Sequence, residues 1–540
     1  MSRVGMPDPS SAPQDNLTAS TDAPMVSPPG NTSPNPRRTV QRKLSISEEA
    51  EAASSGRRQP PGFIRAIFET PFRTTTPTTR TTIGEATAYA MDTSARGPLN
   101  QVGGFIGNAI LLLAIEEAAT KPDGRVYGLK PGSLLTTATV ITGIASAIFM
   151  PLVGAIVDHT RHRKAVGIIT AFIVCVITAV QINISADTWF AVLVLEIFGG
   201  FFLIAHITAA MAYLPDLTEV EADLAHLTSR FNMVQYTFQL VYVFIVIGLV
   251  FGLQANTVKT AQMAAALAFA VSAIFMGYSW TFLFRKRPAL SKVPEGENII
   301  STGFKQIGKT AVKIWREYHA LRWFMVALIW SPEAGAGVVL SIAVTFLTVQ
   351  IGLTGGEIGI VNMTLLVFTL PGSAFAQWFI IKFNPLNSFR VSLIFFAASV
   401  AVTCVVMDSK EKKNWIYIFA AMWGICYGWV FPAQRVMQCT LIPRGQNNEI
   451  MGFFSFVTQI LGWLPALLFS IMNEQGVDMR WGLSLVSFFI TAAIFFTFLI
   501  GDYDKAVEQI QQENEREEER LRNEIKGYSS GSLDNIEVEA

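Results

Sequence analysis

Long apolar segments constrain the fold of this chain more than any other feature of its sequence. Twelve of them follow one another, and each is long enough for a helix that crosses a lipid bilayer. A helix satisfies its own backbone hydrogen bonds, as the bilayer core requires. The sequence therefore predicts an all-α integral membrane protein of about twelve transmembrane helices, at residues 95–117, 133–157, 165–183, 188–214, 230–254, 261–284, 323–349, 356–382, 390–407, 414–438, 450–472 and 479–501.

The composition supports a membrane protein and argues against two other classes. Hydrophobic residues make up 51% of the 540 positions and charged residues only 15%, whereas soluble proteins have about 25% charged residues. The formal net charge is zero, so no basic field indicates a nucleic-acid partner. The four cysteines lie in or beside apolar segments and include no CxxC pair. We therefore predict no metal site and no cofactor.

Polar segments divide the chain into five parts. The longest polar gap within the array separates the sixth apolar segment from the seventh, which gives two sets of six. The predicted parts are a disordered N-terminal tail (1–82), a six-helix half (83–285), a central loop (286–320), a second six-helix half (321–501) and an acidic C-terminal tail (502–540). Lys and Arg concentrate in the second-to-third loop and the central loop, which places the central loop and both termini in the cytoplasm.

The central loop contains a basic amphipathic segment between residues 302 and 318. Phe304, Ile307, Ile314 and Trp315 can share one helix face, with four basic residues around it. Such helices commonly lie on the cytoplasmic leaflet. Packing against the helix bundle is the alternative, and the sequence leaves both placements open. The acidic C-terminal tail is expected to be a solvated extension of the last span.

The sharpest local motif lies where the second span meets its following loop. Gly154 and Asp158 precede a basic cluster. The pattern resembles the signature of the major facilitator superfamily, which also has two six-helix halves around a midplane site. The resemblance implies that the Gly permits close helix approach, and that the acidic residue gates the transport cycle. The gating residues predicted on this basis are Gly154, Asp158, Arg161, Arg163 and Lys164. The equivalent loop of the second half, 382–390, lacks the acidic residue and is assigned no role.

Further blocks narrow the resemblance over residues 83 to 501. They resemble the autophagy-related protein 22 family of vacuolar amino-acid effluxers. The blocks are Tyr89 to Ser94, Tyr213-Leu-Pro-Asp216, Phe324 to Gly337, Pro432-Ala-Gln-Arg435, and Leu441-Ile-Pro443-Arg-Gly445 through Gly452-Phe with Gly462-Trp-Leu-Pro465. The resemblance implies amino-acid export from a vacuole-like compartment, driven by protons. Two positions depart from the family's pattern. Asp92 is displaced from the position of the family's acidic residue, and Pro332-Glu333-Ala334 replaces an expected Asn-Asp-Gly. The identity of the solute therefore stays open.

Ionisable residues at membrane depth are costly, which makes each a functional candidate. Asp92 and Arg96 are four residues apart on one helix face and precede Gly97-Pro98, which should break or kink the first span. The alternative is an exposed ion pair at the cytoplasmic interface. Glu196 lies within the fourth span, and His206 follows ten residues later. A histidine titrates near neutral pH and suits proton coupling, although a hydrogen-bonded core role is the alternative.

Two candidates lie in the second half. Glu333 sits between helix-breaking residues in the seventh span, a position that suits cation coupling or amine binding, or a hydrogen bond that holds a kinked helix. Arg435 in the tenth span could hold a carboxylate with its guanidinium, or reach the headgroups near the helix end.

The sequence contains no nucleotide-binding GxxxxGK[ST], no HExxH and no Ser-His-Asp arrangement, so we predict a transporter rather than an enzyme or an ATP-driven pump. The predicted function is secondary active transport of a small organic solute, with protons as the coupling ion. The predicted protein is monomeric and lies in a vacuolar or lysosome-like membrane, or in the plasma membrane. A carrier of a sugar or anion, and a non-transporting receptor or scaffold, are the alternatives.

Overall fold

A computed structural model describes residues 83–214, 217, 221–287, 299–331, 338–442, 447–512 and 515–516. All of them belong to one compact unit that begins at Pro60. The described residues are almost entirely helical, and their one β interaction is an isolated bridge between Val126 and Leu129. The predicted N-terminal tail and most of the acidic C-terminal tail lie outside the described residues. The all-α prediction is confirmed.

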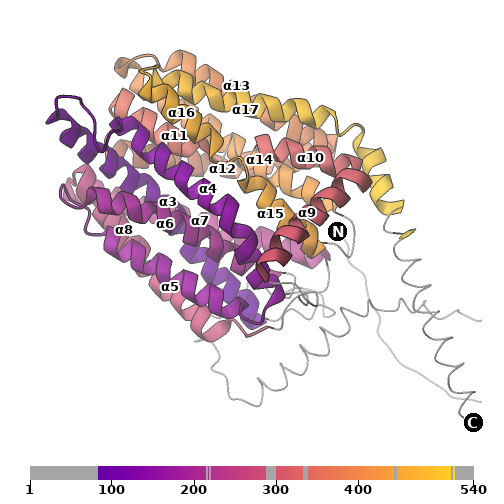
Figure 1. Ribbon diagram of the computed structural model, residues 1–540. Coiled ribbons are helices and arrows are strands. Elements are labelled where there is room, and N and C mark those ends of the chain that lie inside the picture. Colours follow the sequence, from indigo (N-terminus) through magenta and orange to yellow (C-terminus); the bar gives the residue numbers. More distant parts are fainter. Residues whose placement is uncertain are drawn as a thin grey trace, which may run out of the picture. The chain divides into compact units, whose positions relative to one another are not determined.

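The first half of the array contains seven helical elements. These are α3 (Ile83–Ala119), α4 (Pro131–His159), α5 (Arg163–Gln181), α6 (Trp189–Met211), α7 (Glu221–Leu253), α8 (Thr257–Tyr278) and the π-helical turn η4 (Ser279–Leu283), which continues α8. Helix α9 (Ile299–Glu317) follows in the central loop. Figure 1 shows the first half, indigo to magenta, beside the second half in orange and yellow.

The second half begins with an interrupted span. Its elements are α10 (His319–Trp330), α11 (Val338–Phe346) with η6 (Leu347–Ile351), α12 (Gly355–Phe383), α13 (Pro385–Val406), η7 (Lys410–Trp415) with α14 (Ile416–Leu441), α15 (Asn447–Gln459), α16 (Leu464–Glu474) and α17 (Met479–Phe498). Eleven described helical segments are long and apolar enough to cross a membrane. The predicted seventh span is described as two shorter apolar helices on either side of residues 332–337, which lie outside the described residues.

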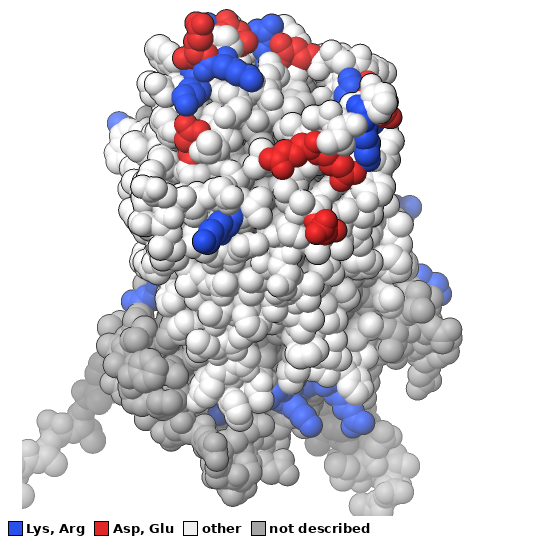
Figure 2. Space-filling model, turned by 90° about the vertical axis from the view of Figure 1, so that its left-hand side faces the viewer, with Lys and Arg blue, Asp and Glu red and all other residues white. Residues whose placement is uncertain are grey.

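The outer surface of this unit is apolar at mid-height. Figure 2 shows one face with charged side chains of both signs at its upper end, Lys and Arg at its lower end, and a broad band between them almost free of charge. Large hydrophobic side chains that point outward include Ile381, Val405 and Phe172, with 79%, 70% and 68% of their surface exposed. Such exposure would be unfavourable in water, so the band is the surface that contacts lipid.

Helix α3 differs from the predicted first span. It begins at Ile83 instead of residue 95, and it continues through Gly97 and Pro98 without a break. The span is therefore not broken at these residues, and a kink there stays a prediction. Gly97 permits close packing, because a Cβ atom there would lie 2.7 Å from the Gln235 carbonyl oxygen and 2.9 Å from the Gln239 nitrogen of α7. Helices in a membrane tolerate proline where neighbouring helices support the local backbone.

Glycines also bring α12 and α14 into backbone contact. A Cβ atom on Gly428 would overlap the carbonyl oxygen of Thr369 and lie 2.9 Å from the backbone nitrogen of Ser373. Small residues of this kind allow helix association in membranes, where lipid is as apolar as the side chains.

We expect Gly428→Ala to force α12 and α14 apart and to destabilise the protein by about 1–3 kcal/mol, the usual cost of overpacking. The measurement is thermal unfolding of the purified protein in detergent. Gly248→Ala is the matched control, since a Cβ atom there would meet nothing within 4 Å and alanine favours a helix. Equal melting temperatures for the two variants would contradict the packing account.

The central loop contains helix α9, which covers the predicted amphipathic segment up to Glu317, and Figure 1 shows it running across the ends of α4 and α15. A Cβ atom on Gly303 would lie 2.8 Å from the Pro151 carbonyl oxygen of α4, and His159 of α4 hydrogen-bonds Gln306 at 2.9 Å. One face of α9 therefore packs against the bundle.

Candidate functional site

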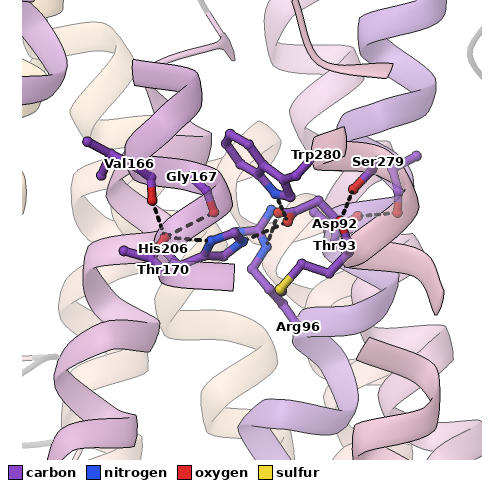
Figure 3. A network of polar contacts seen from close by, with 11 residues as sticks. Asp92, Thr93, Arg96, Val166, Gly167, Thr170, His206, Ser279 and Trp280 are labelled. Atoms are coloured by element: carbon purple, nitrogen blue, oxygen red, sulfur yellow. Dashed lines mark hydrogen bonds and ion pairs between the residues drawn. The ribbon is translucent and has the colours of Figure 1, made fainter. Parts of the chain in front are cut away.

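A buried polar cluster lies among the helices of the first half, with Asp92 at its centre (Figure 3). One oxygen of Asp92 on α3 accepts two hydrogen bonds: from Nε1 of Trp280 in η4 at 2.7 Å, and from Nε2 of His206 in α6 at 2.8 Å when that nitrogen is protonated. Its second oxygen lies 2.9 Å from Nε of Arg96, one turn along α3. Three elements that are distant in sequence thus supply one site.

The cluster is fully enclosed. Asp92 and His206 have no exposed surface, and Arg96 retains 3%. The prediction that Asp92 and Arg96 face one another is confirmed, and the alternative of an exposed interfacial pair is wrong. Charged groups persist at such a position only when they are paired and hydrogen-bonded, because desolvation of an isolated charge is very costly.

His206 connects Asp92 to α5. Its Nδ1 atom lies 3.0 Å from the hydroxyl oxygen of Thr170. That hydroxyl also lies 2.8 Å from the carbonyl oxygen of Val166 and 3.2 Å from that of Gly167, so it has backbone acceptors besides the imidazole. When His206 is neutral, its Nε2–H can donate to Asp92 while the Thr170 hydroxyl donates to Nδ1. When His206 is protonated, Nδ1–H donates to Thr170, whose hydroxyl then donates to Val166. The cluster can accept one proton with every hydrogen bond preserved.

Arg96 has hydrogen-bonding capacity left over. Its guanidinium carbon lies 5.1 Å from the centre of the Tyr89 ring. Its Nη2 atom is buried and has no hydrogen-bond partner among the residues that the structure describes. A buried donor of this kind is rare in native proteins; Tyr89 and Asp92 are the side chains that interact electrostatically with this guanidinium.

The other predicted candidates do not join this cluster. Glu196 on α6 is half-buried and accepts a hydrogen bond of 2.7 Å from Gln181 of α5. Arg435 on α14 is half-buried, and its guanidinium donates to the Gln438 side-chain oxygen at 3.4 Å. Glu333 lies outside the described residues.

The predicted gating motif is described in part. The side chain of Asp158 lies outside what the structure describes. Arg161 is exposed, while Arg163 donates to the Ala212 carbonyl oxygen at 2.9 Å and Lys164 to the Thr281 carbonyl oxygen at 3.2 Å. These two contacts stay within the first half. A Cβ atom on Gly154 would meet nothing within 4 Å among the residues that the structure describes, and its gating role stays a prediction.

Sequence reasoning missed two members of the cluster. Trp280 and Thr170 lie in apolar segments, where a tryptophan or threonine is ordinary. Their roles depend on packing between helices: Trp280 lies against Gly167, where a side chain would collide with its ring. The sequence signal was Gly167, a small residue about one turn before Thr170 on α5. A single sequence does not show that this glycine packs against Trp280.

Contacts between the two halves occur at the end opposite α9. Glu474 of α16 pairs with Arg125 at 2.6 Å and accepts from the Lys130 backbone nitrogen at 2.8 Å. Nearby, Asn473 donates to Ser133 at 2.8 Å. These polar contacts join the start of α4 to the end of α16 and close the two halves against one another there.

We expect Glu474→Ala to weaken this closure and to raise the population open at this end. The pair is partly exposed, so about 1 kcal/mol is lost, which corresponds to a shift of roughly 5-fold. Reaction of a single engineered cysteine at Thr137 with a membrane-impermeant maleimide measures the shift. Glu116→Ala removes an exposed carboxylate at the same end and serves as control. Unchanged labelling in Glu474→Ala would contradict the role of this contact.

Comparisons with known proteins agree with this architecture. The family model for the Major Facilitator Superfamily matches residues 100–466. The uncharacterised MFS-type transporter YxiO of Bacillus subtilis (strain 168) is 20% identical over 413 residues, covering 76% of this chain and 94% of YxiO. The autophagy-related protein 22 resemblance is not shown by these comparisons.

Solved structures share the fold at low identity. They include a mutant of the nucleoside transporter NupG (11% identity, TM-score 0.55, covering 77% of this chain and 100% of that one). A bacterial homologue of the iron transporter ferroportin in the inward-facing state has 14% identity and a TM-score of 0.52, covering 78% and 98%. The human organic anion transporter MFSD10 has 12% identity and a TM-score of 0.51, covering 81% and 100%. This chain belongs to the Major Facilitator Superfamily.

Proposed function

We propose that this protein is a proton-coupled secondary carrier of a small organic solute. The observation that carries the proposal is the buried Asp92–His206 pair, which can accept one proton without losing a hydrogen bond. Buried ionisable groups in membrane spans commonly form proton relays. In this proposal, proton uptake by the cluster changes the relative stability of the two access states of the carrier.

A proton suits this cluster better than a metal cation. The site offers one carboxylate and one imidazole, and Arg96 already neutralises the carboxylate at 2.9 Å. A divalent cation would have to displace or oppose that guanidinium. A proton adds charge only on the imidazole, at a nitrogen that has a hydrogen-bond acceptor ready in Thr170.

For the solute we propose an amino acid, exported from a vacuole-like compartment by alternating access, with both termini in the cytoplasm. The sequence blocks that resemble the autophagy-related protein 22 family support this choice. Arg435 supports it as well, because a half-buried guanidinium within a span suits a carboxylate. The structure does not describe most side chains of the block from Leu441 to Gly452, so its role rests on sequence.

The test is uptake into liposomes that contain the purified protein, with an imposed pH gradient. The solute panel contains neutral and charged amino acids, uridine, xylose and a dicarboxylate. The proposal expects accumulation of one or more amino acids that collapses when a protonophore removes the gradient. Accumulation of only the sugar or the dicarboxylate would replace the proposed solute. Absence of transport for every compound, with a correctly folded protein, would favour a receptor or scaffold.

A further inference from the structure

Helix α9 presents a second, unburied face. Gly303, Thr310 and Ile314 are buried on the side that faces the bundle. On the adjacent side, Phe304, Val312 and Trp315 keep 47%, 51% and 54% of their surface exposed. Phe304 and Trp315 are eleven residues apart, about three helical turns, so they lie on one line along the helix.

Basic residues border this apolar face. Helix α9 carries Lys305, Lys309, Lys313 and Arg316 against a single acidic residue, Glu317. Lys309 and Arg316 are exposed, and Lys313 is half-buried. Around the helix the order is a buried face, an exposed apolar face and a basic face. This order is typical of a helix that lies in the interface of a bilayer.

The end of α9 is fixed at the level of a span terminus. The Trp315 and Trp323 ring centres are 6.0 Å apart, and the Arg322 guanidinium carbon lies 5.5 Å and 5.4 Å from these two rings. Trp323 and Arg322 belong to the first turns of α10, a helix of the seventh span. Tryptophan and arginine are favoured at the boundary between hydrocarbon and headgroups. The C-terminal end of α9 therefore lies at the level of the headgroups.

We propose that α9 binds the anionic lipids of the leaflet on its own side of the membrane. Phe304, Val312 and Trp315 enter the headgroup region, and Lys309, Lys313 and Arg316 contact the lipid phosphates and carboxylates. Each basic residue near an anionic surface strengthens such binding about 5-fold. Helix α9 packs on α4 of the first half and contacts α15 of the second, so the bound lipids touch a helix that joins both halves.

The acidic C-terminal tail is a rival occupant of the basic face. In residues 502–540, Asp and Glu outnumber Lys and Arg twelve to five. The tail offers little to cover the exposed apolar side chains, because Ile510 is already buried in the core of the second half and Leu521 and Ile525 are isolated among charged residues. An anionic bilayer supplies both the apolar and the charged partner.

The experiment measures hydrogen–deuterium exchange of the full chain in nanodiscs. One disc type contains phosphatidylcholine only, and the other contains phosphatidylserine at about one lipid in three. We expect amides of residues 304–317 to exchange at least roughly 5-fold more slowly in the phosphatidylserine discs. The triple variant Lys309→Gln/Lys313→Gln/Arg316→Gln should lose this slowing. Lys382→Gln/Lys505→Gln, which removes exposed charges elsewhere, should keep it.

A truncation after residue 512 separates the two occupants. If lipid covers α9, the truncated chain keeps the phosphatidylserine-dependent slowing. If the tail covers α9, truncation speeds the exchange of α9 amides in phosphatidylcholine discs, and phosphatidylserine changes that exchange little. This result would overturn the proposal. Equal exchange in both disc types for the full chain would overturn it too. Native mass spectrometry, which counts the phosphatidylserine molecules retained, checks that any loss in the triple variant reflects lipid binding.

Discussion

Replacing Asp92 by alanine should destabilise the protein by about 3–5 kcal/mol, the usual cost of removing one partner from a buried ion pair. The Arg96 guanidinium would stay buried with no counter-charge, and Trp280 and His206 would lose their shared acceptor. Thermal unfolding of the purified protein in detergent measures the loss.

Two variants separate this effect from a general sensitivity to lost carboxylates. Asp408→Ala removes the acidic member of an exposed pair with Lys412, and little change is expected. Asp92→Asn/Arg96→Gln removes both charges while keeping side chains that hydrogen-bond, and it should be more stable than Asp92→Ala. If Asp92→Ala melted at the parent temperature, the cluster would not be the buried ionic site described here.

Replacing His206 by glutamine should abolish solute accumulation driven by a pH gradient and spare exchange of solute for solute. A glutamine amide can still donate to Asp92 but does not accept a proton near neutral pH. Exchange needs no net proton movement, so it survives. Paired counterflow and gradient-driven uptake on one liposome preparation measure the two activities. Equal loss of both would indicate a folding or binding defect instead of lost coupling.

Thr170→Val provides a graded comparison for His206. Valine has nearly the same shape as threonine, yet it leaves the Nδ1–H of a protonated His206 with no acceptor. The neutral ring also loses the hydroxyl that donates to Nδ1, but the loss is larger for the charged ring, because hydrogen bonds to charged groups are stronger. Uptake driven by a pH gradient should therefore fall below that of the parent, while counterflow is kept. Gradient-driven uptake equal to that of the parent would show that the Thr170 hydroxyl does not stabilise the protonated ring.

The helices of this fold were predictable because each span needs an apolar segment long enough to cross the bilayer. The helix ends were harder to predict. Helix α3 begins twelve residues before the predicted position, because the mixed Ala, Thr and Met residues between Gly84 and Ser94 give no clear apolar boundary. The eleventh span is described as α15 and α16, separated after Gln459, although its hydrophobicity is continuous. Hydrophobicity predicts which residues are buried in lipid or protein, but it does not predict where a helix ends.

The candidate site was predictable only where its members share a helix. Asp92 and Arg96 could be paired by their spacing of four. His206 was identified as a titratable residue at membrane depth, but its contact with Asp92 depends on how α3 and α6 cross. Trp280 and Thr170 carried no signal that links them to Asp92 or His206, because their chemistry is ordinary until those residues lie beside them. Glu333 stays a prediction, and Glu333→Gln is the comparison variant for any coupling assay.

Proton movement driven by solute tests the coupling account most directly. Liposomes with the purified protein and an entrapped pH-sensitive dye start with no pH gradient, and a solute transported by the parent protein is added outside. The account predicts that the parent moves protons with the solute and changes the internal pH. It predicts that His206→Gln, still active in counterflow, moves solute with no such change. A full proton signal from His206→Gln would contradict the account and leave the coupling role to a carboxylate, with Glu333 and Glu196 the first to test.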